Sequence, residues 1–323
     1  MVTNETTVVR GPYFDELRVG TVLPSPPAVT LTSGLQAAHA AVVGNRVAIT
    51  LDHDLGQRVA GGPIAGPALV WDLSIGQSTV ATQHVRANLF YRGLWFHRQP
   101  LLGDTLRTRT EVAALRENTR RPGRPPTGLA ELRITTVDQH DRLVLDYRRC
   151  AMVLLSPSSE PTGRLDELST DDSVEAPDPL RSLQGWDLES LPSMPRPDVG
   201  AVFSVLGGDV VSSAPELARL TGNVARVHHD RDAAGGERLV YGGHSIGLAL
   251  HHVCQALPGL VAVAGWHGCD HLAPVHEGDL VTSSVAVERS EDLHGGSVAL
   301  TLLVVSSVGD TEVLAWRPVV VVR

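Results

Sequence analysis

The stretch RLVYGGHSIGLALHHVCQAL, residues 238–257, decides the fold of this chain. Two glycines open an apolar run that is typical of a buried central helix. The first half of the chain contains a comparable run, GPALVWDLSI at residues 66–75. In each half a Gly-Asn pair precedes the helical run, and a Gly-Asp pair follows it. The two halves therefore carry the same order of structural signals.

The spacing between matching positions supports a duplication. Asn45 and Asn223 differ by 223 − 45 = 178 positions. The glycines that open the helical runs differ by 242 − 66 = 176, and the aspartates of the Gly-Asp pairs by 279 − 104 = 175. Three nearly equal offsets indicate an internal repeat of one domain.

Strand signals close each half. β-Branched, roughly alternating segments between Gly, Asp and Asn turns predict three strands in each half. They cover residues 105–114, 128–137 and 143–155, then 280–287, 297–308 and 311–322. A helix followed by antiparallel strands predicts an α+β domain in which a curved sheet wraps the helix. Two such domains would pair their sheets side by side.

A change of composition separates the halves. The run from Ser156 to Leu183 is rich in Ser, Pro, Asp and Glu and has no helical or strand period. Such a segment buries too little apolar surface to form a core, so it predicts a linker. The expected organisation is an N-terminal domain at residues 11–155, a linker at 156–183 and a C-terminal domain at 184–323.

Composition bounds the class of protein. A chain of 323 residues is long enough for two domains, and its net charge of −9 argues against general nucleic-acid binding. The three cysteines are scattered, which is typical of reduced thiols and not of a disulfide framework. No signal peptide or membrane span is recognisable. We therefore expect a cytoplasmic protein, monomeric or homodimeric, without nucleic-acid or membrane partners.

Three segments carry a resemblance to a known family: RLTGNVARVHHD at residues 219–230, RLVYGGHSIGLA at 238–249 and LDYRRCAMVLL at 145–155. They resemble MaoC-like enoyl-CoA hydratases, in particular mesaconyl-CoA hydratase, also called β-methylmalyl-CoA dehydratase. The resemblance runs from about residue 13 to the end of the chain. It implies a tandem, or double, hotdog fold that adds water to an acyl-CoA thioester or removes it. It implies no cofactor beyond the CoA of the substrate.

The resemblance also implies a site. The hydratase pattern sets an Asp five residues before a His, and a Gly then starts the central helix. The second half places Asn223, His228 and the pair Gly242 and Gly243 at these positions, whereas the first half has Thr50 in place of the His. We therefore expect one catalytic site per chain, built on the second half.

These residue types suit the chemistry of hydration. His228 titrates near neutrality, so it can take a proton from water and return it to carbon. Backbone N–H groups of Gly242 and Gly243, at a helix N-terminus, can stabilise the enolate-like oxygen of the thioester. Asn223 cannot shuttle a proton as an Asp could, but its amide can orient the water.

Three further residues are candidates for substrate binding. Arg226 stands two residues before the His and could bind the second carboxylate of a dicarboxylic acyl group. Alternatively, it could pair with Asp230 or with an acidic residue at the interface between the domains. Tyr241 could line the acyl pocket or pack at the helix start. Ser245 could bond the thioester or serve the first helical turn.

Other functions remain open at this stage. The same reaction on an ordinary 3-hydroxyacyl-CoA, or on a carrier-protein acyl chain, would give Arg226 nothing to bind. A thioesterase would want a carboxylate at the helix start, where this chain has glycines. A catalytically degenerate protein that only binds a thioester would fit Asn223 and Thr50.

Two other features are weaker signals. The segment WHGCDH at residues 266–271 could suggest a metal, but no second ligand cluster follows at suitable spacing. We expect no metal, and we expect this segment to lie beside the sheet. Two arginine-containing tracts, the run at residues 116–126 and YRR at residues 147–149, could meet CoA phosphates. The composition of the first favours a solvated hairpin loop.

Overall fold

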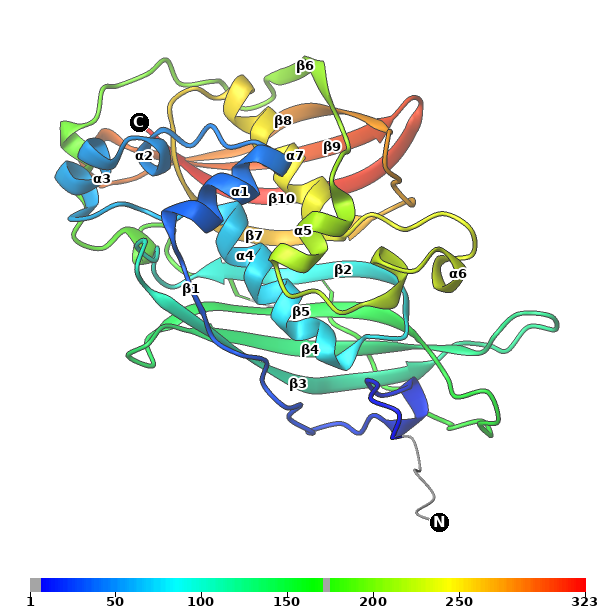
Figure 1. The fold of residues 1–323 in the computed structure, drawn as a ribbon. Helices are drawn as coiled ribbons and strands as arrows, with labels where there is room; N and C mark the ends of the chain where they lie inside the picture. The colour runs from blue at the N-terminus through cyan, green and yellow to red at the C-terminus, as the bar shows by residue number, and fades with distance from the viewer. Residues whose placement is uncertain (1–6, 171–174) are drawn as a thin grey trace.

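One antiparallel sheet organises the computed structural model, which describes residues 7–170 and 175–323. In this part of the chain ten strands lie in the order β1-β3-β4-β5-β2-β7-β10-β9-β8-β6 (Figure 1). Their bounds are β1 Val29–Thr30, β2 Val85–Phe96, β3 Thr105–Glu117, β4 Thr127–Val137, β5 Leu143–Leu154, β6 Val202–Val210, β7 Leu260–His271, β8 Leu280–Asp292, β9 Val298–Val308 and β10 Thr311–Val322.

The two halves meet at the middle of this sheet. Strands β1 to β5 belong to the first half and β6 to β10 to the second, and β2 pairs with β7 between them. In this pair Tyr91 lies opposite Cys269, and Arg92 forms an ion pair with Asp270 at 2.7 Å. The predicted α+β fold, with two hotdog sheets side by side, is confirmed.

Two long helices lie against one face of the sheet, α4 (Pro67–Gln77) and α7 (Gly242–Ala256) (Figure 1). Every residue of α4 is buried, as are most residues of α7, so both helices are apolar nearly all round. The other α-helices of the described residues are α1 Ser33–Val43, α2 Ala48–Leu51, α3 His53–Ala60, α5 Ala214–Leu220 and α6 Arg231–Ala234. Nothing helical in the described residues has the length and apolarity to cross a membrane.

A cluster of tryptophans ties the helices to the central strands. Trp71 of α4 meets Trp266 of β7 edge to face, with ring centroids 5.2 Å apart. Trp316 of β10 contacts both rings at centroid distances of 6.1 and 5.8 Å. All three side chains are fully buried. The cluster therefore joins a first-half helix to second-half strands within one continuous core.

Most sequence-predicted elements are present, and one expectation is wrong. The helices and the six closing strands begin or end within a few residues of their predicted bounds. The segment WHGCDH, expected beside the sheet, instead lies within β7, at the centre of the sheet. That strand is buried along most of its length, so it shows no alternation of polar and apolar residues that would identify it.

The segment expected to be a linker is fastened to the first half. Ser156 donates to Asp15, and both the N–H and the hydroxyl of Ser169 donate to Glu131. Residues 156–170 and 175–183 contain no strand, and the segment ends in a short 3₁₀ helix at Arg181–Leu183. The domain limits at 155 and 184 stay a prediction.

Candidate active site

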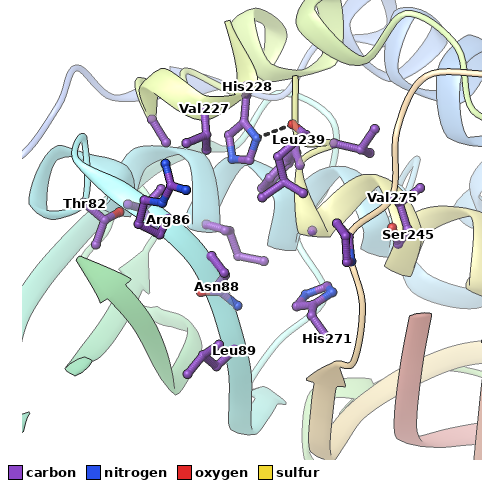
Figure 2. A pocket seen from close by; sticks show the side chains of 18 of the residues that line it. Thr82, Arg86, Asn88, Leu89, Val227, His228, Leu239, Ser245, His271 and Val275 are labelled. Atoms are coloured by element: carbon purple, nitrogen blue, oxygen red, sulfur yellow. Dashed lines mark hydrogen bonds between the residues drawn. The ribbon is translucent and has the colours of Figure 1, made fainter. Parts of the chain in front are cut away.

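A cavity of about 350 Å³ lies beside the N-terminus of α7 (Figure 2). Its wall combines both halves: β2, β5 and the end of α4 from the first, and the loop around His228, the start of α7 and the end of β7 from the second. A volume of this order suits a small-molecule site. Of the residues predicted to form the site, His228, Asn223, Tyr241, Gly242 and Ser245 line the cavity.

His228 lies in the short 3₁₀ helix η6 (Arg226–His228), and its ring points toward the cavity (Figure 2). Its Nδ1 lies 2.7 Å from the carbonyl oxygen of Leu239. Because a carbonyl can only accept, Nδ1 carries the proton. In the neutral ring Nε2 therefore keeps its lone pair, which is the arrangement a general base needs.

The surroundings of His228 keep the ring neutral. Burial lowers the pKa of His228 to about 4, although the hydrogen bond to Leu239 opposes the shift. The ring of Tyr241 packs edge to face against it, with centroids 5.8 Å apart. At neutral pH the imidazole is therefore uncharged, and its Nε2 carries no proton.

Asn223 presents only donors to the cavity. Its Oδ1 accepts from the N–H of Ala225 at 2.9 Å, which fixes the orientation of the amide. Its Nδ2 is buried and has no hydrogen-bond partner in the described part of the chain. Because an unpaired buried donor is costly, this amide is suited to an acceptor supplied by water or by a ligand.

The two glycines at the start of α7 occupy different environments. A Cβ on Gly242 would lie 2.6 Å from Nε2 of His271, so any larger residue here would have to displace that ring at the wall of the cavity. A Cβ on Gly243 would lie 2.0 Å from Oδ1 of Asp72, on α4. Gly243 does not line the cavity, and its closest contacts are with the first-half helix. Of the two glycines, Gly242 therefore lies at the cavity, and the expected role of the Gly243 N–H stays a prediction.

Tyr241 and Ser245 complete the wall at α7. The hydroxyl of Tyr241 donates to the backbone oxygen of Asp72 at 3.0 Å, so this side chain connects the two central helices. Ser245 lies one turn into α7 and lines the cavity (Figure 2). Both predicted positions are therefore at the site, and Tyr241 has a packing role as well.

The structure does not bring Arg226 into the cavity. Its guanidinium pairs with Asp230 at 2.7 Å, and about half of its side chain is exposed. This is the alternative partner considered from the sequence. The expected role in binding a substrate carboxylate is therefore not supported by the position of Arg226.

Three further cavity residues were not among the expected catalytic and acyl-binding residues: Asn88 was not considered, His271 was considered only within a possible metal segment, and Arg149 only as a contact to CoA phosphates. Both polar atoms of Asn88 and the Nε2 atom of His271 are buried without a hydrogen-bond partner among the described residues, and both residues line the cavity (Figure 2). Arg149 also lines it. Asn88 lies on β2, His271 ends β7 and Arg149 lies on β5. No local pattern marks these residues, because packing between strands and halves brings them together.

The matching position in the first half is filled by its own side chains. Asn45 donates through Nδ2 to Thr50 Oγ1 at 2.8 Å, and its Oδ1 accepts from the N–H of Val47 at 3.1 Å. At the start of α4 the N–H of Gly66 donates to Gln36 Oε1 at 2.7 Å. This half therefore repeats the loop and the helix start but leaves neither free for a ligand.

Comparisons with known proteins agree with this architecture. A scan against models of protein families finds no match. The chain is 29% identical to the β-methylmalyl-CoA dehydratase of Chloroflexus aurantiacus, over 84% of this chain and 80% of that protein. It is 28% identical to the mesaconyl-CoA hydratase of Cereibacter sphaeroides, over 95% of this chain and 92% of that protein.

A solved structure extends the comparison to the fold. A conserved hypothetical protein of Mycobacterium tuberculosis, described as essential for bacterial survival during infection and as having a double hotdog fold, is 49% identical. The match covers 96% of this chain and 98% of that chain, with a TM-score of 0.87. With the duplicated helix and sheet, and the site at the second helix, this places the chain in the double-hotdog family.

Proposed function

We propose that this protein is a hydro-lyase that hydrates an enoyl-CoA or dehydrates a 3-hydroxyacyl-CoA, with one site per chain. The observation that carries this proposal is the orientation of His228: its Nδ1–H is held by Leu239, and its ring faces a cavity at the start of a buried helix. The two curated relatives are named for reactions of this type.

His228 and Asn223 have different roles in the proposed hydration reaction. In hydration, Nε2 of His228 takes a proton from water as the water oxygen bonds to Cβ of the thioester. The double-bond electrons move onto Cα and the thioester oxygen, and the imidazolium then gives its proton to Cα. The amide of Asn223 orients the water through its Nδ2 donors. Because no second acid is required, an Asn at this position is compatible with turnover.

The thioester oxygen belongs at the N-terminus of α7. Tyr241, which precedes this helix, makes no side-chain cap, and the first N–H groups of a helix carry partial positive charge. Gly242 lets a ligand approach these groups because it has no Cβ. The negative charge that develops on the thioester oxygen is stabilised there without reorganisation of the protein.

The CoA portion has a suitable path out of the cavity. Arg86 lines the cavity and also a neighbouring surface groove, where Arg120, Arg121 and Arg124 of the β3–β4 hairpin are found. No acidic residue is among the described residues that line this groove. Guanidinium groups bind phosphates well, so we assign the phosphate groups of CoA to this hairpin.

The acyl group is proposed to be short and to carry a second carboxylate. The relatives are named for mesaconyl-CoA and β-methylmalyl-CoA, both of which are dicarboxylic acyl thioesters. A cavity of about 350 Å³ leaves little room for a long acyl chain once the thioester is seated.

The proposal is tested by following the loss of enoyl absorbance with purified protein and mesaconyl-CoA or crotonyl-CoA. We expect mesaconyl-CoA to be hydrated, and His228→Ala to lower kcat by roughly 100- to 10,000-fold. His140→Ala, at an exposed position in the β4–β5 turn, is the matched control and should keep full activity. Equal activity in the His228→Ala variant would overturn the assignment.

A second candidate is a protein that binds the thioester without turnover, and the amide at Asn223 is the observation that favours it. Calorimetry separates the two. If neither thioester reacts but CoA thioesters bind at micromolar concentrations, the cavity is a binding site and the hydro-lyase proposal fails.

A further inference from the structure

We propose that Arg149 is the residue that recognises the second carboxylate of a dicarboxylic acyl group. This inference rests on the proposed function, since it assigns the specificity of the same cavity. It replaces Arg226, which the structure places outside the cavity and in an ion pair with Asp230.

Arg149 is a buried cation that has no anionic partner among the described residues. Its side chain is only 3% exposed, on the central part of β5. Its hydrogen bonds go to neutral groups: Ser78 Oγ at 2.8 Å, Thr82 Oγ1 at 2.6 Å and, more weakly, the backbone oxygen of Ile75 at 3.5 Å. Within residues 7–170 and 175–323 no carboxylate lies at ion-pair distance from it. Burial of a charge is costly unless a counter-ion is present or arrives with a ligand.

The neighbouring arginine shows the usual solution. Arg148, adjacent on the same strand, forms an ion pair with Glu131 at 2.8 Å. Arg92, opposite on β2, pairs with Asp270 at 2.7 Å. Arg149, the one residue of β5 that lines the cavity, has no such ion pair within the described residues. The missing anion is therefore best supplied by what the cavity holds.

The guanidinium of Arg149 is fixed by hydrogen bonds, and some of its N–H donors remain unused. Ser78 donates its hydroxyl proton to Ile75 O at 2.6 Å, so its oxygen must accept from Arg149. A guanidinium has five N–H donors. In Arg149, Nη1 makes two of the three contacts, to Ile75 O and Ser78 Oγ, and Nη2 makes the third, to Thr82 Oγ1. Nε is buried without a partner among the described residues. The unused donors match the two oxygens of a carboxylate.

The charge of the cavity wall favours an anionic acyl group. Two arginines, Arg86 and Arg149, line the cavity, and no Asp or Glu is among its described lining residues. Arg86 belongs to the mouth shared with the basic groove assigned to CoA phosphates, whereas Arg149 is buried. The two cations therefore have separate tasks, one at the CoA side and one at the acyl group.

The competing explanation is that Arg149 only stabilises the C-terminal end of α4, where Ile75 O lies. The two explanations predict different substrate dependence. A helix cap would affect mesaconyl-CoA and crotonyl-CoA equally, because it acts on the protein fold and contacts neither acyl group. A carboxylate-binding residue would affect mesaconyl-CoA alone.

The test is the ratio of kcat/KM for mesaconyl-CoA over crotonyl-CoA in wild type and Arg149→Gln. We expect the ratio to fall roughly 10- to 100-fold, mainly through KM for mesaconyl-CoA, with crotonyl-CoA within about 3-fold of wild type. Arg109→Gln, at an exposed arginine of β3, is the control and should leave the ratio unchanged. A ratio unaltered in Arg149→Gln would overturn the proposal.

Two further measurements keep the test decisive. If Arg149→Gln does not fold, Arg149→Lys keeps the cation near α4 but loses the planar fork, and the ratio should still fall about 5-fold. If wild type hydrates neither substrate, calorimetry with succinyl-CoA and butyryl-CoA replaces kinetics. A preference for succinyl-CoA that disappears in the variant supports Arg149 even though the hydro-lyase proposal has failed. No preference in wild type refutes it.

Discussion

The N-termini of α4 and α7 are two versions of one structure, and only one of them is open. At α4 the N–H of Gly66 is bonded to Gln36, and the amide of Asn45 is bonded to Thr50. At α7 the equivalent Nδ2 of Asn223 has no partner in the described chain, and a His stands where the first half has Thr50. Duplication supplied the same backbone twice, and side chains decide which copy can receive a ligand.

The comparison teaches how a site differs from its structural copy. In both halves the Asn side-chain oxygen accepts from the backbone two residues later, so the loop itself is the same. The first half satisfies its remaining polar groups internally, which favours stability. The second half leaves them unsatisfied around a cavity, which is the pattern expected where a ligand completes the hydrogen bonds.

The largest expected effect on activity comes from giving the second half the residue that the first half has at the matching position. His228→Thr should abolish measurable hydration, because a hydroxyl cannot act as a base near neutral pH. In the first half, Thr50→Ala should keep activity but lower the free energy of unfolding by about 1–3 kcal/mol, since it leaves the half-buried Nδ2 of Asn45 unpaired. Steady-state kinetics and denaturant unfolding measure both. A loss of activity in Thr50→Ala would mean that the first half takes part in catalysis.

The paired glycines give the next largest difference. Gly242→Ala would place Cβ 2.6 Å from His271 Nε2, so we expect kcat/KM to fall roughly 10- to 100-fold as the helix start shifts. Gly66→Ala would place Cβ 3.5 Å from the nearest atom, Asn45 Nδ2, which is an ordinary contact. That variant should keep wild-type kinetics. Equal tolerance of both substitutions would argue against a thioester oxygen at α7.

The pH dependence tests the state of the base. Because burial lowers the pKa of His228 to about 4, the ring stays neutral well below its usual pKa. In the absence of substrate-induced shifts, kcat/KM should be nearly flat from pH 7.5 to about 5 and should fall only toward pH 4. An acidic limb centred near 6.5 would instead indicate a solvent-exposed base.

His228 and two other buried histidines predict how the stability of the fold changes in acid. Burial also lowers the pKa of His244 and His271 to about 4. Between pH 6.5 and 4 the unfolded chain binds more protons at these groups than the folded chain, so stability should fall as the pH falls through this window. Thermal unfolding followed from pH 7.5 to 4.5 measures it, and a Tm that rises on acidification would contradict this prediction.

The smallest effect is expected at Arg226. Its ion pair with Asp230 is exposed, and such pairs contribute little to stability. Arg226→Gln should leave kcat/KM for mesaconyl-CoA within about 2-fold and the free energy of unfolding within about 1 kcal/mol. A selective loss with mesaconyl-CoA would restore Arg226 to the site and displace Arg149 from the role proposed for it.

Much of the fold could be predicted from the sequence because its signals are local. The helix beginning at Gly242 and the strand at 311–322 follow from apolar runs and alternation within each segment. Strand β7 could not be identified in this way, since it is buried along most of its length and has no period of two. Pairing between β2 and β7 is a contact between halves, and no local pattern encodes it.

The site was predictable to the same extent. His228 and Asn223 were found because they belong to one short segment that resembles a known pattern. Arg226 lies in that segment too, but a 3₁₀ helix turns residues two apart to different sides, so proximity in sequence did not place it at the cavity. Arg149 comes from a strand of the other half, and its lack of a counter-ion is visible only in three dimensions.

The most direct test of the account is mass spectrometry of the acyl-CoA after incubation of mesaconyl-CoA in H₂¹⁸O. The account predicts a product heavier by one labelled water, formed by wild type and by Thr50→Ala, and not by His228→Thr. Release of free CoA without a hydrated thioester, or labelled product formed by His228→Thr, would contradict it.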